Sequence, residues 1–325
     1  MALSMRLGLV TDSLGQLTFE QMLDACLDLG IPHLEFPTGG WSNAPHCDVR
    51  ALLDDSAQLE AFRGALADRE LSISALNANG NQLHPVIGAD VDRVVRDTVD
   101  LAHRLEIPTV VCMSGLPGGA PGDQTPNWVT SSWPPETQDI LDYQWNEVAL
   151  PYWQDLAEYG RERGVRFAVE MHGSQLVYSA STLLRLRSEI GDQVGANFDP
   201  SHPMWMGADP RALARGLTGA IYNMHAKDAR VQPHVADING LLDTQPPSED
   251  RTRAWNYVTL GLGYPGGAQF WGQLLADLRL AGYDGVLAIE HEDMQRDAYD
   301  GLAHTVSLLS SVMPVGAPSW TPADI

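Results

Sequence analysis

Acidic and imidazole side chains end four successive apolar segments in the second half of the chain. In chain order they are Glu170, His172, Asp199, His202, His225 and Glu290. A lone acid or histidine at such a place is usually a cap or a hydrogen-bonded core group. Carboxylates that converge in a buried place, however, are costly unless a cation lies between them. We therefore predict a metal site, with a structural network of ion pairs as the alternative.

The predicted metal ligands are three carboxylates and one imidazole: Glu170, Asp199, His225 and Glu290. This oxygen-rich set favours Mn²⁺, with Mg²⁺, Co²⁺ and Fe²⁺ as alternatives. Such an ion makes a carbon beside a carbonyl acidic, because it stabilises the enediolate that forms when the proton leaves. Isomerisation, epimerisation, dehydration and β-elimination all begin with this step. His172 lies two residues after Glu170, so strand alternation places it on the same side as a candidate acid or base.

Eight apolar, strand-like runs must position these residues, and amphipathic helical stretches separate them. The runs are 6–12, 33–38, 72–77, 109–114, 166–172, 194–199, 221–227 and 286–292. The stretch after the first run has a helical period, with Thr18 as its cap and Gly30 as its end. Eight such units predict a (β/α)₈ TIM barrel. An open doubly wound sheet is the alternative, but no Gly-x-Gly-x-x-Gly turn follows the first run.

Two long insertions interrupt this pattern, at 116–138 after the fourth run and at 229–267 after the seventh. In a barrel both follow the C-terminal ends of strands, where catalytic loops gather. We interpret them as lids or partner-binding surfaces, with plain surface decoration as the alternative. The chain, 1–325, is predicted to form one domain, with the barrel at about 6–314 and a tail at 315–325.

Composition argues against several classes of protein. The 325 residues include 42 acids and 20 bases, a net charge of -22 that repels nucleic acid and anionic lipid surfaces. No apolar run approaches the roughly 20 residues that a membrane-spanning helix needs, so we expect a cytoplasmic protein. The three cysteines stand at no ligand-like spacing, which predicts no thiol or disulfide chemistry.

Four sequence phrases resemble those of the sugar phosphate isomerase/epimerase family, the xylose isomerase-like TIM barrels. They are Val169-Glu170-Met171-His172, Asn197-Phe198-Asp199-Pro200-Ser201-His202, His225-Ala226-Lys227-Asp228 and Ile289-Glu290-His291-Glu292-Asp293. The resemblance extends over about 6–314 and is strongest after residue 165. It implies a metal-dependent sugar isomerase or epimerase in which Glu170 and Glu290 exchange protons with a ketose between them. It also implies that His202 contacts substrate oxygens.

Several further residues are predicted to bind the substrate. Glu35, Asn77 and His84 are candidates for holding sugar hydroxyls, with local capping and turn hydrogen bonds as the alternative. Lys227 either binds an oxyanion or pairs with a surplus carboxylate, and we favour pairing. Arg230 stands one residue before the position at which ketose 3-epimerases of the family carry an arginine.

Two departures from the epimerase pattern keep other reactions open. Val231 occupies the position of that arginine, and Leu176 occupies the position of a second family acid. The chain is also similar to the catalytic α subunits of C-glycoside deglycosidases, which pair with a small β subunit and eliminate the aglycone from a 3-oxo-glycoside. Such a lyase is the first alternative, and an inosose dehydratase is a further one.

Three other expectations concern partners and class. Apolar loops on a barrel rim often mediate self-association, so a homo-oligomer is expected if no small subunit binds. A DNA-repair endonuclease built on the same barrel is disfavoured, because the chain is strongly acidic. A non-catalytic binding protein on this barrel is the alternative outside the enzymes.

Overall fold

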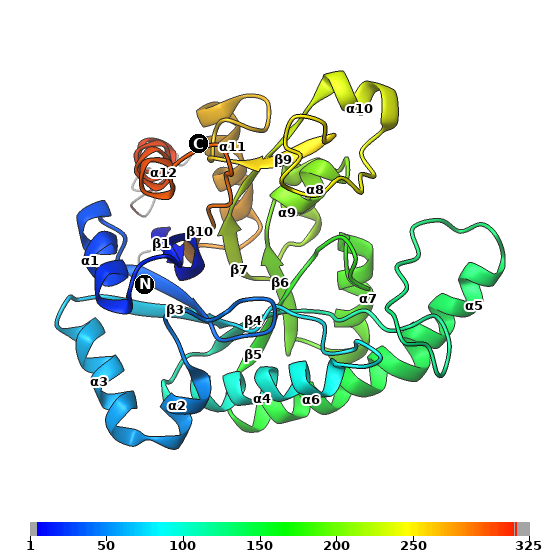
Figure 1. The fold of residues 1–325 in the computed structure, drawn as a ribbon, viewed down its shortest axis with the longest axis horizontal. Coiled ribbons are helices and arrows are strands. Elements are labelled where there is room, and N and C mark those ends of the chain that lie inside the picture. The colour runs from blue at the N-terminus through cyan, green and yellow to red at the C-terminus, as the bar shows by residue number, and fades with distance from the viewer. Residues whose placement is uncertain (1–4, 315, 317–325) are drawn as a thin grey trace, which may run out of the picture.

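Eight parallel strands close into a barrel in the computed structural model, which describes residues 5–314 and 316 (Figure 1). The strands are β1 (Arg6–Val10), β2 (His33–Pro37), β3 (Ser72–Asn77), β4 (Thr109–Met113), β5 (Arg166–Glu170), β6 (Val194–Phe198), β7 (Ile221–Ala226) and β10 (Val286–Ile289). β10 pairs with β1 and thereby closes the sheet. Each strand falls on one of the eight predicted runs. The predicted barrel is confirmed, and the open sheet is wrong.

Helices follow the strands, and most of them cover the outside of the barrel (Figure 1). They are α1 (Phe19–Leu29), α2 (Val49–Asp54), α3 (Ser56–Ala67), α4 (Gly88–Arg104), α5 (Glu136–Asp142), α6 (Leu150–Glu162), α7 (Ala180–Ile190), α8 (Ser201–Trp205), α9 (Pro210–Gly216), α10 (Pro233–Asn239), α11 (Gly267–Leu280) and α12 (Ala298–Val312). None of the helices in the described part of the chain combines the length and apolar character that a bilayer crossing requires.

Helix α1 illustrates how local sequence sets these elements. The Thr18 side chain accepts a hydrogen bond from the Gln21 backbone amide, and the Gln21 side chain accepts one from the Thr18 backbone amide. Two amides that lack a partner within the helix are thereby satisfied. Gly30 ends the helix at a φ of 70°, a conformation that glycine adopts without strain. Met22 and Cys26 lie on the buried face. Both predicted boundaries of this helix are confirmed.

Side-chain alternation along the strands decides which residues reach the barrel interior. In β5, Phe167 and Val169 join the large core between the barrel and the helices, whereas Ala168 joins a small interior cluster with Ala75 and Val111. Glu170, two residues after Ala168, therefore faces the interior at the C-terminal end of the strand. Because small side chains fill the middle of the barrel, the polar end groups have room to meet above them.

The two insertions follow β4 and β7, as predicted. The first carries the loop that leads to α5, which extends away from the barrel in Figure 1. The second forms an antiparallel hairpin, β8 (Asp228–Val231) with β9 (Trp255–Val258), and carries α10. Trp255 stacks on Trp205 of α8, with ring centroids 4.5 Å apart and planes 7° apart. The hairpin is thereby packed against the β6 side of the barrel. The predicted tail, 315–325, lies outside the described residues except for residue 316.

Candidate metal centre and active site

Three of the four predicted metal ligands meet at the C-terminal end of the barrel. Ligand atoms of Glu170, Asp199 and His225 all lie within 4.8 Å of one another, and all three residues are buried. Oxygen and nitrogen ligands sit about 2.0–2.2 Å from a transition-metal ion, so two ligands of one ion are separated by at most about 4.4 Å. The triad thus brings three potential ligand atoms to about the spacing that one ion requires.

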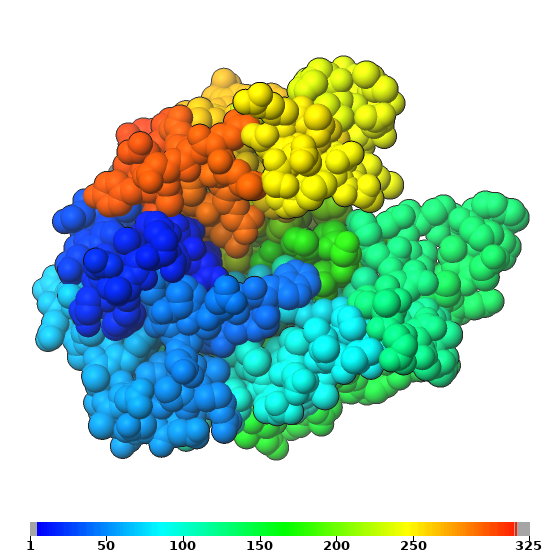
Figure 2. Space-filling model, viewed as in Figure 1, coloured from blue at the N-terminus to red at the C-terminus, as the bar shows by residue number. Residues whose placement is uncertain are grey.

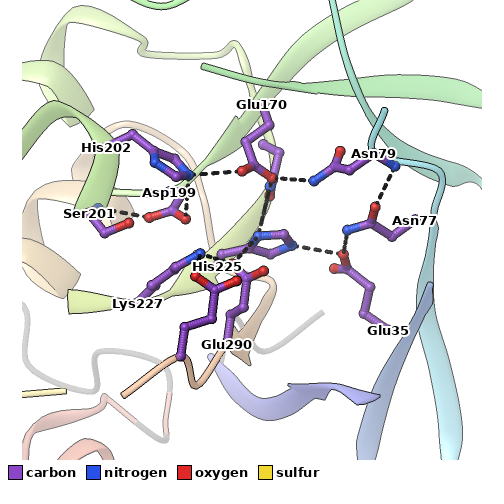
Figure 3. Close-up of polar contacts among 12 residues, drawn as sticks. Glu35, Asn77, Asn79, Glu170, Asp199, Ser201, His202, His225, Lys227 and Glu290 are labelled. Atoms are coloured by element: carbon purple, nitrogen blue, oxygen red, sulfur yellow. Dashed lines mark hydrogen bonds and ion pairs between the residues drawn. The ribbon is translucent and has the colours of Figure 1, made fainter. Parts of the chain in front are cut away.

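Glu170 is held from three sides, as Figure 3 shows. Its Oε2 accepts hydrogen bonds from Asn79 Nδ2 at 2.8 Å and Asn197 Nδ2 at 2.9 Å, and its Oε1 accepts one from His202 Nε2 at 3.0 Å. Burial alone would raise the pKa of this carboxyl. The hydrogen bond from His202 and the positive charges of His225 and His202 outweigh burial and hold the pKa well below its usual range. Glu170 is therefore an oriented carboxylate.

Asp199 carries the observation that best tests whether a cation fits. Its Oδ1 accepts a hydrogen bond from the Ser201 amide at 2.7 Å. Its Oδ2 is buried and accepts no hydrogen bond from any residue that the structure describes. The protonated His202 ring forms an ion pair with this oxygen, with Nε2 3.2 Å away, while its Nε2–H donates its hydrogen bond to Glu170 Oε1. A buried carboxylate oxygen without a donor is costly, and a divalent cation among the triad removes that cost. The residues present fit a divalent metal.

His225 is oriented by Glu35, a residue predicted to bind substrate. Glu35 is fully buried, and its Oε1 accepts a hydrogen bond from His225 Nε2 at 2.8 Å. This contact turns His225 Nδ1 toward the triad, 3.4 Å from Glu170 Oε2. Histidine ligands of metals commonly donate their second N–H to a carboxylate in this way. Burial would lower the pKa of His225, but Glu35 and Glu290 raise it well above its usual value.

Three asparagines beneath the triad complete this buried network. Asn77 Nδ2 and Asn223 Nδ2 each donate to Glu35 at 2.8 Å. Asn223 Nδ2 also donates to Asn197 Oδ1 at 3.0 Å, and Asn197 in turn donates to Glu170. Asn77 and Glu35, both predicted to hold sugar hydroxyls, therefore use their polar atoms to support the triad. Asn77 also lines the pocket.

Glu290, the fourth predicted ligand, lies beside the triad. Its Oε2 is 3.2 Å from His225 Nδ1 and 3.2 Å from Lys227 Nζ, and Lys227 also contacts Glu292 at 2.7 Å. Burial would raise the pKa of Glu290, but Lys227 and His225 lower it to about 2. Lys227 is buried and forms ion pairs with both glutamates, in agreement with the favoured interpretation of this residue.

His172 and His202 form the wall above the triad. Burial, together with the charge of His202, lowers the pKa of His172 to about 4, so this ring is neutral. Its Nδ1 is hydrogen-bonded to the Gly173 carbonyl, which leaves Nε2 as the acceptor. Burial would likewise lower the pKa of His202, but Asp199 and Glu170 raise it to about 9. The protonated His202 donates to Glu170 and, through Nδ1 at 2.9 Å, to the Tyr257 hydroxyl.

These groups line a cavity of about 240 Å³. Its walls include Glu170, Glu290, His172, His202 and Lys227, with Trp41 and Tyr257 from the loops and the second insertion. Figure 2 shows this face of the molecule, with the segments of the second insertion in yellow beside the orange C-terminal part. The structure thus gathers most of the predicted site residues around one cavity.

Two predicted substrate-binding residues lie elsewhere. His84 Nδ1 accepts hydrogen bonds from the Val86 and Ile87 amides, so it is a local turn residue. Arg230 lies on strand β8, and its Nη2 is 3.5 Å from Gln295 Oε1. Among the residues described by the structure, the cavity wall includes neither His84 nor Arg230. Sequence spacing placed both on the rim but gave no direction for their side chains.

Sequence reasoning also missed three residues of the site. Asn197 and Asn223 stand two residues before Asp199 and His225, so strand alternation was a usable signal that they form the layer beneath the triad. Tyr257 contacts His202 only because the second insertion folds back as a hairpin. We find no sequence signal that would have revealed this contact.

Comparison with known proteins agrees with this fold. The model of the family described as xylose isomerase-like TIM barrel matches residues 23–311. The chain belongs to this family. The family is generally enzymatic, and its members are typically sugar isomerases and epimerases. The predicted family is confirmed at this level.

Three known proteins illustrate the similarity. The uncharacterized protein YfiH of Bacillus subtilis (strain 168) is 43% identical over 313 residues, covering 95% of this chain and 99% of YfiH. The crystal structure of the IolI protein with a bound zinc atom has a TM-score of 0.67 at 17% identity, covering 95% of this chain and 98% of IolI. The structure of L-ribulose 3-epimerase has a TM-score of 0.63 at 16% identity, covering 94% of each chain. At these identities the two structures show a shared fold.

Proposed function

We propose that this protein is a divalent-metal-dependent sugar isomerase or epimerase that removes a proton from the carbon next to a carbonyl. The observation that carries the proposal is the buried triad of Glu170, Asp199 and His225, in which Asp199 Oδ2 faces the other ligands without a hydrogen-bond donor among the described residues. The zinc atom in the related IolI structure supports a metal in this fold. The oxygen-rich set leads us to propose Mn²⁺ as the native ion.

The protein's own groups divide the remaining tasks. A divalent cation at the triad would supply electrostatic stabilisation of the negative charge that develops on the substrate oxygens. Glu170 and Glu290 are both carboxylates in the cavity wall, and they accept and return the substrate proton. The neutral His172 ring presents Nε2 as a further acceptor. His202 fixes the orientation of Glu170 by donating to its Oε1.

Sugar recognition would rest on the polar walls and one exposed indole. Asn79 and Asp12 line the cavity beside the triad, where they reach sugar hydroxyls. Trp41 lines the same cavity and is 55% exposed, so its ring face is available to stack on a sugar. Burying that indole under a substrate would remove apolar surface from water without moving the triad.

A lyase acting on a 3-oxo-glycoside is the second candidate, and one observation favours it. A second cavity of about 590 Å³ adjoins the first, and both are lined by Ser13, His172, Tyr257, His291 and Glu292. Trp255 and Met294 form an apolar part of the wall of this second cavity. The adjoining space would accommodate a group attached to the sugar, as a glycoside requires. In this case we propose a small β subunit as partner, whereas the isomerase is proposed to act as a homo-oligomer.

Proton NMR in D₂O tests both candidates. Mn²⁺-loaded protein is incubated with free ketoses, their phosphates and a 3-oxo-glycoside, and a chelated sample serves as control. Metal-dependent deuterium uptake with an isomeric product supports the isomerase or epimerase, whereas release of an aglycone supports the lyase. Glu170→Gln should lower turnover by at least about 100-fold with the fold retained, because it removes a ligand and a base. The exposed Glu158→Gln is the matched control. The proposal is contradicted if Glu170→Gln exchanges deuterium as fast as Glu158→Gln does.

A further inference from the structure

The second cavity is lined by a buried arginine that forms no ion pair with the residues that the structure describes. Arg253 lines this cavity and is only 8% exposed. Its Nη1 lies 3.3 Å from Asn256 Oδ1, and its guanidinium lies 4.6 Å from the centroid of the Trp255 ring. Its Nε is buried and has no hydrogen-bond acceptor within the described part of the chain. Over residues 5–314 and 316, Arg253 forms no ion pair with a carboxylate; Asp243 feels its charge, but the backbone amides of Ala254 and Gln245 are the hydrogen-bond donors to that carboxylate.

The acidic residues that share this cavity are already engaged. Asp293 accepts hydrogen bonds from the Thr259 amide and hydroxyl, at 2.8 and 2.7 Å. Glu292 pairs with Lys227, and Asp250 accepts a hydrogen bond from Gln295. None of these contacts neutralises Arg253. A buried guanidinium with five donors and one neutral acceptor is unfavourable on its own, because charged groups leave water at a high cost.

We propose that Arg253 binds an oxyanion, a carboxylate or a phosphate, carried by the substrate. This inference rests on the proposed function, since it assigns the substrate class of that site. The planar guanidinium matches the two oxygens of such a group, and the Trp255 face keeps it in one orientation. The shared wall at His172 and Tyr257 joins the cavities. The reacting end of the substrate therefore lies at the triad and the anionic end at Arg253.

The first test measures binding without any turnover. Nitrogen-15-labelled, metal-free protein is titrated with sodium phosphate and separately with sodium acetate at constant ionic strength. The Arg253 Nε–H signal is assigned by its loss in Arg253→Gln. We expect a saturable shift of this signal with at least one anion, and the preferred anion distinguishes phosphate from carboxylate. A signal that stays unchanged with both anions, in protein that remains folded, overturns the inference whether or not the enzyme assay succeeds.

The second test compares substrates. Arg253→Gln should raise the KM for an anionic sugar substrate by about 10- to 100-fold and leave the KM of its neutral counterpart unchanged, since a hydrogen bond to a charged group is lost. Arg230→Gln, which removes the same charge from the same hairpin outside the cavity, should alter neither KM. If Arg253→Gln raises the KM of the anionic and the neutral substrate equally, Arg253 has a structural role and the inference is overturned. Arg253→Lys keeps the charge without the planar fork and serves if the glutamine variant fails to fold.

Discussion

Glu35→Gln is the perturbation that most directly separates support of the metal from contact with substrate. Glu35 is fully buried and accepts hydrogen bonds from Asn77, Asn223 and His225, each at 2.8 Å. A glutamine of the same shape has one acceptor oxygen and one NH₂ group. Whichever way the amide is turned, its NH₂ faces a donor, either Asn223 or the pair of Asn77 and His225. At least one hydrogen bond is therefore replaced by a repulsive contact.

The size of the effect follows from these contacts. Hydrogen bonds to a charged acceptor contribute about 1.5–3 kcal/mol each. The contact that holds His225 Nδ1 toward the triad loses its charged acceptor in either orientation of the amide, and loses its acceptor altogether in one of them. Weakening this contact should weaken Mn²⁺ binding by about 10- to 100-fold, the usual range for groups that orient a ligand from behind. In free energy this is about 1.4–2.8 kcal/mol. A residue that only contacted substrate would leave metal affinity unchanged.

Isothermal titration of chelator-treated protein with Mn²⁺ measures the difference. Wild type, Glu35→Gln and the exposed control Glu20→Gln are compared at one pH, with circular dichroism as the check of folding. We expect only Glu35→Gln to bind Mn²⁺ more weakly. A dissociation constant within twofold of wild type, in a folded Glu35→Gln protein, would refute the argument that this carboxylate orients His225. A raised KM with unchanged metal affinity would return Glu35 to the substrate site.

Three other predictions follow from the same contacts. Mn²⁺ at about 100 times its dissociation constant should stabilise the folded protein by about 2.7 kcal/mol, seen as a higher melting temperature that EDTA abolishes, and an unchanged temperature contradicts the site. Metal binding should release protons, because Glu35 and Glu290 raise the pKa of His225 well above its usual value and a metal ligand must give up its proton; titrations in buffers of different ionisation enthalpy count the protons released, and no release as the pH falls toward 6 contradicts the assignment. Tyr257→Phe should lower the free energy of unfolding of the metal-free protein by about 1 kcal/mol in urea, because His202 Nδ1 loses its acceptor. Tyr264→Phe is the control, and equal effects of the two substitutions would argue against this hydrogen bond.

The sequence predicted the barrel well because local patterns carried the information. Each run of apolar residues had the length of a strand, and residues such as Thr18 and Gly30 mark helix ends through contacts with near neighbours. The candidate ligands Glu170, Asp199 and His225 were predictable for the same reason. They stand at the ends of consecutive parallel strands, and closing the barrel brings those ends together.

Only the tertiary structure decided where the side chains of the site point and which groups they contact. Glu35 looked like a sugar ligand, yet the pairing of distant strands points it at His225, 190 positions away. Tyr257 and Arg253 reach the cavities only because the second insertion folds as a hairpin over the barrel. Spacing along one strand fixes which face a residue occupies. Which group meets it depends on other strands and loops, whose relative positions are set by packing across the whole barrel.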